Sequence, residues 1–306
     1  MPNKNRLATH SDFRPYVDSE GETYMVRPEV LTLEDIYSIV PQLKGHDRLV
    51  NAVARFLMID RVNEVHARWS GTPGIEFSHA LVEKEFDIDL RTDGEEILSE
   101  FRDRPFVTVS NHALGAMDGI ILLHLVGKYR PDYKLMVNMF LNNLSAMRPN
   151  FIAVDPSQSD DPKKKKATLD GIRTVINRIR EGHPVGFFPA GAVSKIDRTL
   201  HISDRRWQPS VIRLIKKAGV PVVPIYFHGH NSTLFNILGL ISWKIRTLRL
   251  PAEVFDKQGR IQHVSVGDPI PVEKIKACPD EEALSALLRD ATYSLKSRPL
   301  PPSSKR

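Results

Sequence analysis

The alternation of short apolar runs with helical runs constrains the fold of this chain more than any other feature. Beyond Pro105, runs rich in β-branched and aromatic residues alternate with runs whose apolar residues recur at helical spacing. The predicted strands cover residues 106–110, 134–140, 151–154, 185–188 and 220–227, and predicted helices follow from residues 118, 169 and 211. Strands that alternate with helices predict an α/β fold, with helices on the faces of a sheet.

Three regions are predicted along the chain. Residues 1–90 form a helical N-terminal region, since apolar residues recur at helical spacing between Thr32 and Arg68. Residues 91–298 form the α/β domain, and residues 299–306, rich in proline, serine and basic residues, form a disordered tail. The strand at 220–227 contains Pro221 and Pro224, which predict an edge or irregular strand because proline lacks an N–H donor.

Composition narrows the class of protein. The chain has 306 residues, 41% of them hydrophobic, which is enough to bury a core. Its one cysteine, Cys278, forms no internal disulfide and indicates a reducing compartment. The polar N-terminus lacks the apolar segment of a secretory signal, so we expect a cytoplasmic protein. A net charge of +6 and a pI near 9.3 favour anionic partners: lipid, nucleic acid or an acidic carrier protein.

The most apolar long window, residues 234–250, falls short of a membrane span. Asn236, Lys244, Arg246 and Arg249 interrupt it, and a span needs roughly 20 apolar residues. The mixture of apolar, aromatic and cationic residues is typical of segments that lie at a membrane surface. A buried strand and loop of a basic protein would have the same composition, and we favour this second interpretation on periodicity.

The loop after the first predicted strand of the α/β domain carries His112 and, at the start of the next helix, Asp118. A carboxylate that accepts from one imidazole nitrogen leaves the other nitrogen to take a proton from a substrate hydroxyl. No serine or cysteine nucleophile lies beside them, so the pair predicts direct attack of that hydroxyl on an acyl carbonyl. The alternative is structural: a loop histidine bound to backbone, with Asp118 capping the helix.

Other polar residues follow later strands. Small residues at 189–194 let the backbone approach a ligand, and Lys195 and Arg198 are suited to an anionic head group. His228 and His230 point to the same side of an extended run, but without a cysteine or an obvious acidic partner we predict no metal site. His124, among leucines, is predicted to be a core or helix-surface histidine.

Taken together, these segments resemble the glycerolipid and lysophospholipid acyltransferase superfamily. The motifs are Asn111-His112 with Asp118, then 188–194 in the pattern Phe-Pro-x-Gly-x-x-Ser, then 220–224 in the pattern Val-Pro-x-x-Pro. The resemblance covers residues 100 to 275 and includes Val266 to Ile270, which look like the strand and turn that close the catalytic domain. It implies a mixed sheet flanked by helices and makes 91–298 the catalytic domain.

Departures from the family pattern bear on the acceptor. Five residues, not the usual four, separate His112 from Asp118, and Met117 stands at the usual acid position. This spacing resembles the hemolysin-like branch, associated with lyso-ornithine and lyso-glycine aminolipids. The usual glutamate of the third motif is Ala190, and the segment ending at Asp155 lacks the arginine expected to bind a phosphate monoester. Both differences disfavour glycerol 3-phosphate or lysophosphatidate as acceptor.

The resemblance implies an O-acyltransferase at the inner face of a membrane. His112 would be the general base and Asp118 its orienting acid. The acyl donor would be an acyl-carrier protein or coenzyme A thioester, the acceptor a lysolipid, and no cofactor would be bound. The residues expected to contact substrate are Asn111, Gly119, Phe188, Pro189, Gly191, Ser194, Lys195, Arg198, Asn231 and Ser232.

Three alternatives stay open. The chain could be a catalytically silent lipid-binding or scaffold protein of this fold, or an acyltransferase for lysophosphatidate or glycerol 3-phosphate. Nucleic-acid binding is disfavoured, since no aromatic residues are interleaved with the basic ones and no recognisable module is present. Contact with an anionic membrane surface remains the expected use of the basic charge, and Lys163 to Lys166 are one candidate for it.

Overall fold

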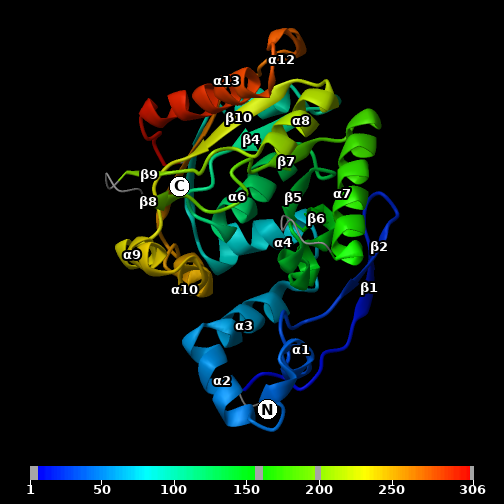
Figure 1. The fold of residues 1–306 in the computed structure, drawn as a ribbon, viewed down its shortest axis with the longest axis vertical. Coiled ribbons are helices and arrows are strands. Elements are labelled where there is room, and N and C mark those ends of the chain that lie inside the picture. The colour runs from blue at the N-terminus through cyan, green and yellow to red at the C-terminus, as the bar shows by residue number, and fades with distance from the viewer. Residues whose placement is uncertain (1–5, 156–160, 197–200, 304–306) are drawn as a thin grey trace.

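A seven-stranded sheet forms the centre of the molecule in the computed structural model, which describes residues 6–155, 161–196 and 201–303 (Figure 1). Its strand order is β3-β11-β10-β4-β7-β5-β6, and every neighbouring pair is parallel except β10 and β11. The strands are β3 (Asp89–Asp93), β4 (Val107–Ser110), β5 (Lys134–Asn138), β6 (Phe151–Val154), β7 (Val185–Phe187), β10 (Val222–Phe227) and β11 (Ile261–Val266). The predicted α/β fold with a mixed sheet is confirmed.

Helices cover both faces of this sheet (Figure 1). Helices α4 and α6 pack on one face and α7, α8 and α13 on the other, because alternate residues of each strand point to opposite faces. The helices are α1 (Leu33–Ile39), α2 (Asp47–Phe56), α3 (Ile59–Trp69), α4 (Ile75–Ala80), α5 (Glu96–Ser99), α6 (Ala116–Gly127), α7 (Pro162–Arg180), α8 (Pro209–Ala218), α9 (Thr233–Ile241), α10 (Trp243–Leu248), α11 (Leu250–Phe255), α12 (Val272–Ala277) and α13 (Glu281–Ser294).

Shorter elements connect these. They are the π-helical turn η2 (Leu81–Glu85) and the 3-10 turns η1 (Pro41–Leu43), η3 (Met139–Asn143), η4 (Ser145–Asn150) and η5 (Leu295–Ser297). Strands β8 (Lys195–Ile196) and β9 (Ile202–Ser203) pair with each other outside the central sheet. In the chain they lie between the third motif, residues 188–194, and α8.

The predicted strands at 106–110, 134–140, 151–154, 185–188 and 220–227 are confirmed as β4, β5, β6, β7 and β10, but β10 is not an edge strand. It lies between β11 and β4. Pro224 is tolerated because β11 leaves the ladder beside it: Gly267 donates to the Pro224 carbonyl, and pairing resumes only at Ile270 with Val222. The irregularity predicted from the prolines is therefore present, within a central strand.

The strand and loop that we favoured for residues 234–250 are also wrong. It folds into α9, α10 and the start of α11 rather than a strand and loop, since Phe235 packs inward and Ser232 caps α9 through the Phe235 amide. No helix within the described residues is long and apolar enough to cross a membrane.

The N-terminal region contains α1, α2 and α3, as predicted, and also a hairpin of β1 (Arg14–Val17) and β2 (Thr23–Val26) that the sequence did not predict. The boundary drawn at residue 90 falls inside β3. Of the tail predicted to be disordered, residues 304–306 lie outside the described residues. Residues 299–303 contact β3, where Arg91 donates to the Pro301 carbonyl and Ser303 to Asp89.

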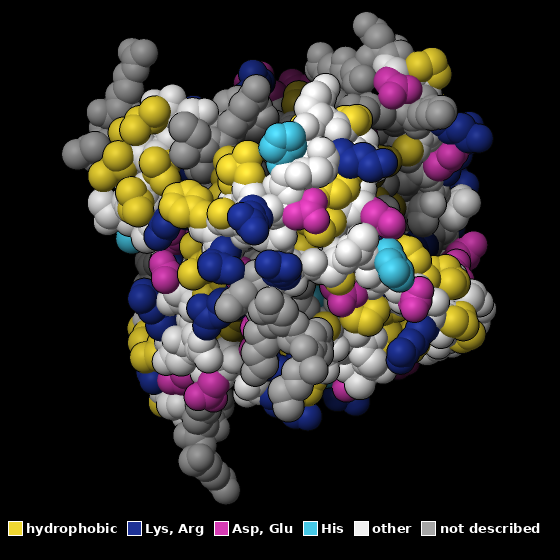
Figure 2. All heavy atoms as spheres, turned by 90° about the horizontal axis from the view of Figure 1, so that it is seen from below, with side chains coloured by type: hydrophobic (Ala, Val, Ile, Leu, Met, Phe, Trp, Pro, Cys, Tyr) yellow, Lys and Arg dark blue, Asp and Glu magenta, His cyan; other side chains and the backbone are white. Residues whose placement is uncertain are grey.

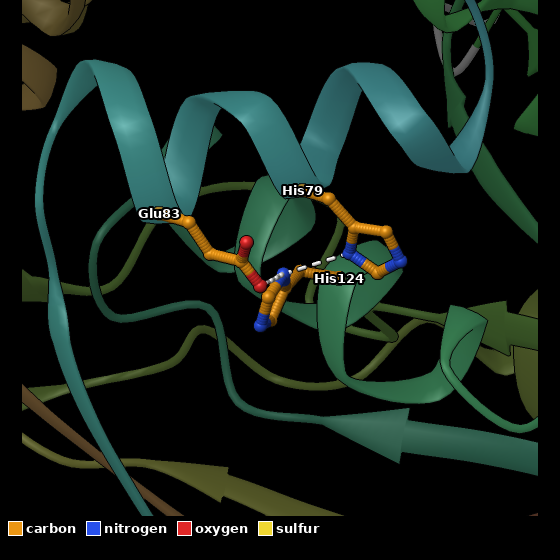
Figure 3. Close-up of side chains that lie close together, drawn as sticks. All are labelled: His79, Glu83 and His124. Carbon is orange, nitrogen blue, oxygen red and sulfur yellow. Dashed lines mark hydrogen bonds and ion pairs between the residues drawn. The ribbon is translucent and has the colours of Figure 1, made fainter. Parts of the chain in front are cut away.

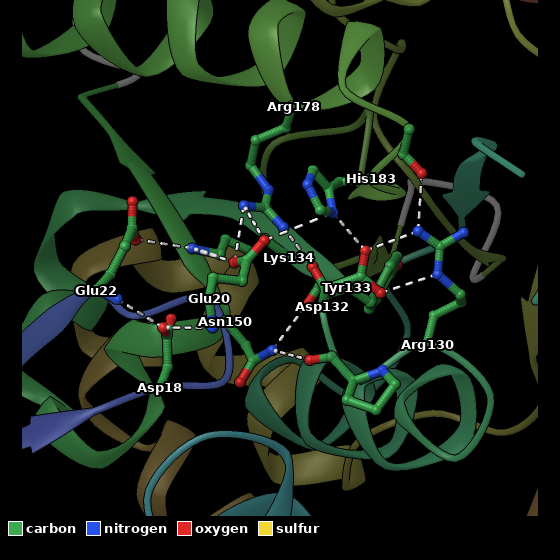
Figure 4. Close-up of polar contacts among 12 residues, drawn as sticks. Asp18, Glu20, Glu22, Arg130, Asp132, Tyr133, Lys134, Asn150, Arg178 and His183 are labelled. Atoms are coloured by element: carbon green, nitrogen blue, oxygen red, sulfur yellow. Dashed lines mark hydrogen bonds and ion pairs between the residues drawn. The ribbon is translucent and has the colours of Figure 1, made fainter. Parts of the chain in front are cut away.

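An ion-pair cluster fixes the turn of the β1–β2 hairpin to the α/β domain (Figure 4). Arg178 of α7 contacts Glu20 at 3.0 Å, and Lys134 of β5 lies 3.4 Å from the same carboxylate. Behind them Asp132 pairs with Arg130 at 2.7 Å and with His183 at 2.6 Å. The three cationic side chains Arg130, Lys134 and Arg178 are buried, so their partners offset the cost of burying their charge.

Candidate active site

His112 and Asp118 meet in the loop between β4 and α6. The Nδ1 atom of His112 lies 3.0 Å from Oδ2 of Asp118, which is fully buried at the third position of α6. The same oxygen accepts from the backbone amides of Leu114 at 2.8 Å and Gly115 at 3.1 Å. Asp118 therefore both caps α6 and contacts the histidine, so the two interpretations open at the sequence level coexist.

The protonation of this pair follows from its contacts. Burial raises the pKa of the Asp118 carboxyl, and the hydrogen bonds from His112 and from the Leu114 amide oppose that rise. An ionised Asp118 can only accept, so the proton of neutral His112 lies on Nδ1. The Nε2 lone pair is then available to take a proton, and Asp118 stabilises the imidazolium that results.

The third motif packs against His112 from β7. The ring of Phe188 stacks on the imidazole, with centroids 4.4 Å apart. Ser194 is buried, and its backbone N–H donates to the carbonyl of His112 at 2.7 Å, while its hydroxyl oxygen lies 3.1 Å from the same carbonyl. Arg246 of α10 donates to the carbonyl of Ser194. This loop thus fixes the position of the imidazole within the site.

Asp204 is a buried residue of the site that sequence reasoning missed. One of its oxygens accepts from the His112 amide at 3.1 Å and from the Ser194 hydroxyl at 2.6 Å. The other accepts from Nε1 of Trp207 at 3.3 Å. No local signal marks Asp204, because its contact with His112 joins residues 92 positions apart and it stands in a polar stretch after β9.

Several predicted contact residues have structural partners. Asn111 donates its side-chain amide to the carbonyl of Phe227 and accepts from the amide of Phe227, which ties β4 to β10. Gly119 lies on α6 beside Leu135. The carbonyl of Pro189 accepts from the Gln208 amide. Gly191 is exposed at a φ of +64°, where a side chain would be strained.

The remaining candidates are Lys195, Arg198, Asn231 and Ser232. Lys195 is exposed on β8, and Arg198 lies outside the described residues. Asn231 is buried, and its side-chain amide has no hydrogen-bond partner among the described residues. Ser232 caps α9 and donates through its hydroxyl to the buried Glu253 at 2.6 Å.

A cavity of about 410 Å³ adjoins the catalytic loop. Asn111 and Ala113, on either side of His112, and Ser194 of the third motif form part of its wall. The rest comes from β9 and His201 before it, from β10 and the residues after it, and from the end of α13 with η5, including Tyr226, His228, His230, Tyr293 and Lys296. In α/β sheets, ligands collect at this edge, beyond the carboxyl ends of the parallel strands.

Two groups of side chains outside the catalytic loop were not expected from the sequence. His79, Glu83 and His124 converge between α4, η2 and α6, with 2.8 Å between the two Nδ1 atoms (Figure 3). One imidazole donating to the other accounts for that contact. Asp93, His228 and His263 also converge, but Arg298 contacts Asp93 at 2.8 Å, and this cation disfavours a metal ion there.

Comparisons with known proteins agree with the motifs. The family model described as "Acyltransferase" matches residues 34–299. A lyso-glycine lipid O-acyltransferase of Bacteroides thetaiotaomicron is 25% identical over 266 residues, which are 85% of this chain and 92% of that protein. A second protein of that name, from Phocaeicola vulgatus, is 28% identical over 232 residues, 72% of this chain and 78% of its own.

Among solved structures, the 1-acyl-sn-glycerophosphate acyltransferase of Thermotoga maritima aligns with a TM-score of 0.46 and 17% identity, over 79% of this chain and 83% of that one. The family match covers most of the length of the present chain. It confirms the relationship predicted from the three motifs. The chain belongs to the acyltransferase family and is an acyltransferase.

Proposed function

We propose that the protein transfers a fatty acyl group from a thioester to the hydroxyl of a lyso-aminolipid. The observation that carries this proposal is the 3.0 Å contact between His112 and buried Asp118, in a chain of the acyltransferase family. Nε2 of His112 takes the proton of the acceptor hydroxyl as its oxygen attacks the thioester carbonyl. The carbon–sulfur bond then breaks, and the imidazolium returns the proton to the departing thiolate.

The choice of an aminolipid acceptor has two supports. The segment around Asp155 and the third motif lack the charged residues expected for a phosphate monoester. The relatives from Bacteroides thetaiotaomicron and Phocaeicola vulgatus are named lyso-glycine lipid O-acyltransferases. The donor in this proposal is an acyl-carrier protein or coenzyme A thioester, both anionic, as the net charge of +6 favours.

We place the reaction at the cytoplasmic face of a membrane, because apolar side chains lie exposed on α9, which contacts β8 beside the site, and on α2 of the N-terminal region. On α9 they include Leu240 and Ile241, which are 60% and 71% exposed, and Phe56 on α2 is 85% exposed. Figure 2 views the end that carries the N-terminal helices, where hydrophobic side chains lie among lysines and arginines. Such a mixed surface suits a protein that rests on anionic lipid.

The experiment is a product analysis by mass spectrometry. Purified protein receives palmitoyl-coenzyme A or palmitoyl carrier protein together with lyso-ornithine, lyso-glycine and lysophosphatidate lipids. We expect a diacyl aminolipid from the wild type and a rate about 10³-fold lower from His112→Ala, the range of a lost general base. His46→Ala removes an exposed imidazole that makes no capping hydrogen bond and should leave the rate unchanged.

Three outcomes would contradict the proposal. Product from lysophosphatidate alone would overturn the acceptor class, and an unchanged rate in His112→Ala would overturn the role of the imidazole. Lipid binding without any product from the wild type would favour a silent binding protein.

A further inference from the structure

The cavity beside the catalytic loop is lined by cationic and imidazole side chains. They are Lys296 and three histidines, His201, His228 and His230, and no aspartate or glutamate is among the described residues that line it. Lys296, His201 and His230 are exposed and stand at the rim. His228 is only partly exposed and lies deeper, beyond the end of β10. The nearest buried carboxylate behind the wall, Asp204, is already occupied by His112, Ser194 and Trp207.

A hydrogen-bond network fixes the orientation and the tautomer of His228. Ser265 of β11 donates its hydroxyl proton to Asp93 at 2.6 Å, because a carboxylate can only accept. The contact of 2.8 Å between the Ser265 oxygen and Nε2 of His228 therefore has the imidazole as donor. The proton of neutral His228 lies on Nε2, and Nδ1 carries a lone pair.

Neighbouring groups keep this imidazole in place and neutral. The ring of His263 stacks on it with 3.6 Å between centroids, and His263 itself contacts Asp93 at 2.8 Å. Arg298 holds the other oxygen of Asp93. Burial, together with the neighbouring His263, lowers the pKa of His228 to about 4, although Asp93 acts in the opposite direction. His228 thus offers an acceptor at neutral pH.

We propose that this cavity binds the head group of the acceptor as an N-acylated amino acid, whose amide N–H donates to Nδ1 of His228 while its carboxylate lies by Lys296. An acylated glycine carries these two groups on either side of a single methylene. The Nδ1 atom has no hydrogen-bond partner among the described residues, and His228 lines the cavity. The proposal rests on the proposed function and names the part of the acceptor that is recognised.

The same geometry disfavours a phosphate monoester in this cavity. A phosphate dianion presents only acceptor oxygens, which would face the lone pair of Nδ1 without a proton to share. A site built to accept from an N–H group rejects ligands that lack it, because its own polar atom is then left unpaired. Discrimination between an amide and an ester is therefore the most direct property to measure.

The test compares two acceptors that differ in one atom: N-(3-hydroxypalmitoyl)glycine and the matching ester of glycolate, which has oxygen in place of N–H. We expect wild-type kcat/KM to be about tenfold higher for the amide, the size of one hydrogen bond in a desolvated site. In His228→Phe the ratio should fall to near one. His228→Asn should restore most of it, since the asparagine oxygen branches from Cγ as Nδ1 does. Equal rates for both acceptors in the wild type, or the same ratio in His228→Phe, would overturn the proposal.

Binding without a donor separates this proposal from the proposed function. Isothermal titration of each lipid into the wild type and His228→Phe measures recognition when no transfer occurs. Tighter binding of the amide by the wild type alone would support the head-group site even if no acyl product formed. Lys296→Ala should weaken binding of the free carboxylate severalfold while leaving the glycine methyl ester unaffected, and equal losses for both would refute the role of Lys296.

Discussion

At the residue scale, the site depends on how firmly the His112 backbone is held. Ser194 and Asp204 bind its carbonyl and its amide, and Phe188 packs on its ring. The imidazole is therefore placed by buried groups that do not themselves need to contact substrate. Small displacements of a catalytic group, near 1 Å, can cost about 100-fold in rate.

We expect Asp204→Ala to lower kcat by about 10- to 100-fold with KM nearly unchanged, because Asp204 acts through the position of His112. Steady-state kinetics with each substrate varied in turn measure this split. Trp207→Phe removes only the bond to the second oxygen of Asp204 and should retain most of the activity. A rise in KM with constant kcat would instead place Asp204 in substrate binding.

At the scale of elements, the ion-pair cluster that joins the β1–β2 hairpin to the α/β domain through Glu20 also contains Asp132, which pairs with Arg130 and His183. Contacts with Arg130 and His183 lower the pKa of Asp132 although burial opposes them. A lowered pKa means that the stabilisation is present above the unfolded pKa of 3.8 and is lost as the pH falls through the folded value.

Asp132→Asn should accordingly reduce the free energy of unfolding by about 3 kcal/mol at pH 7, since it leaves the buried Arg130 without its carboxylate partner. The difference from the wild type should shrink at pH values below 3.8. Urea denaturation at pH 7 and pH 3 checks both statements. A difference that is independent of pH would show that the carboxylate charge is not what stabilises this junction.

At the scale of the whole molecule, the elements that could be predicted from the sequence are those that a local pattern determines. The strands β4 to β7, the strand β10, and the helix α8 that ends at Gly219 all follow from periodicity and stop signals. The position of β10 did not follow, because Pro224 is accommodated by an interruption of β11 that begins 43 residues later, at Gly267. Tertiary packing likewise decided that residues 234–250 are helical.

The candidate site could likewise be predicted only where its residues are close in sequence. His112 and Asp118 lie six positions apart, so their meeting could be predicted. The supports of the site join residues that are distant in sequence, such as Asp204 with His112, and His228 with Ser265 and Asp93. No pattern in one sequence marks such pairs. They appear only when the fold brings the ends of the strands together.

The central claim is that Asp118 orients His112 for proton transfer, and the rate of acyl transfer by Asp118→Asn tests it most directly. The asparagine oxygen can still accept from the Leu114 and Gly115 amides, so the cap of α6 and the thermal stability should remain. The account predicts a fall in kcat of about 10²- to 10³-fold, because the neutral amide, whose oxygen can still accept from Nδ1 of His112, no longer stabilises the charge of the imidazolium. A variant that keeps kcat within about twofold of the wild type would contradict the account.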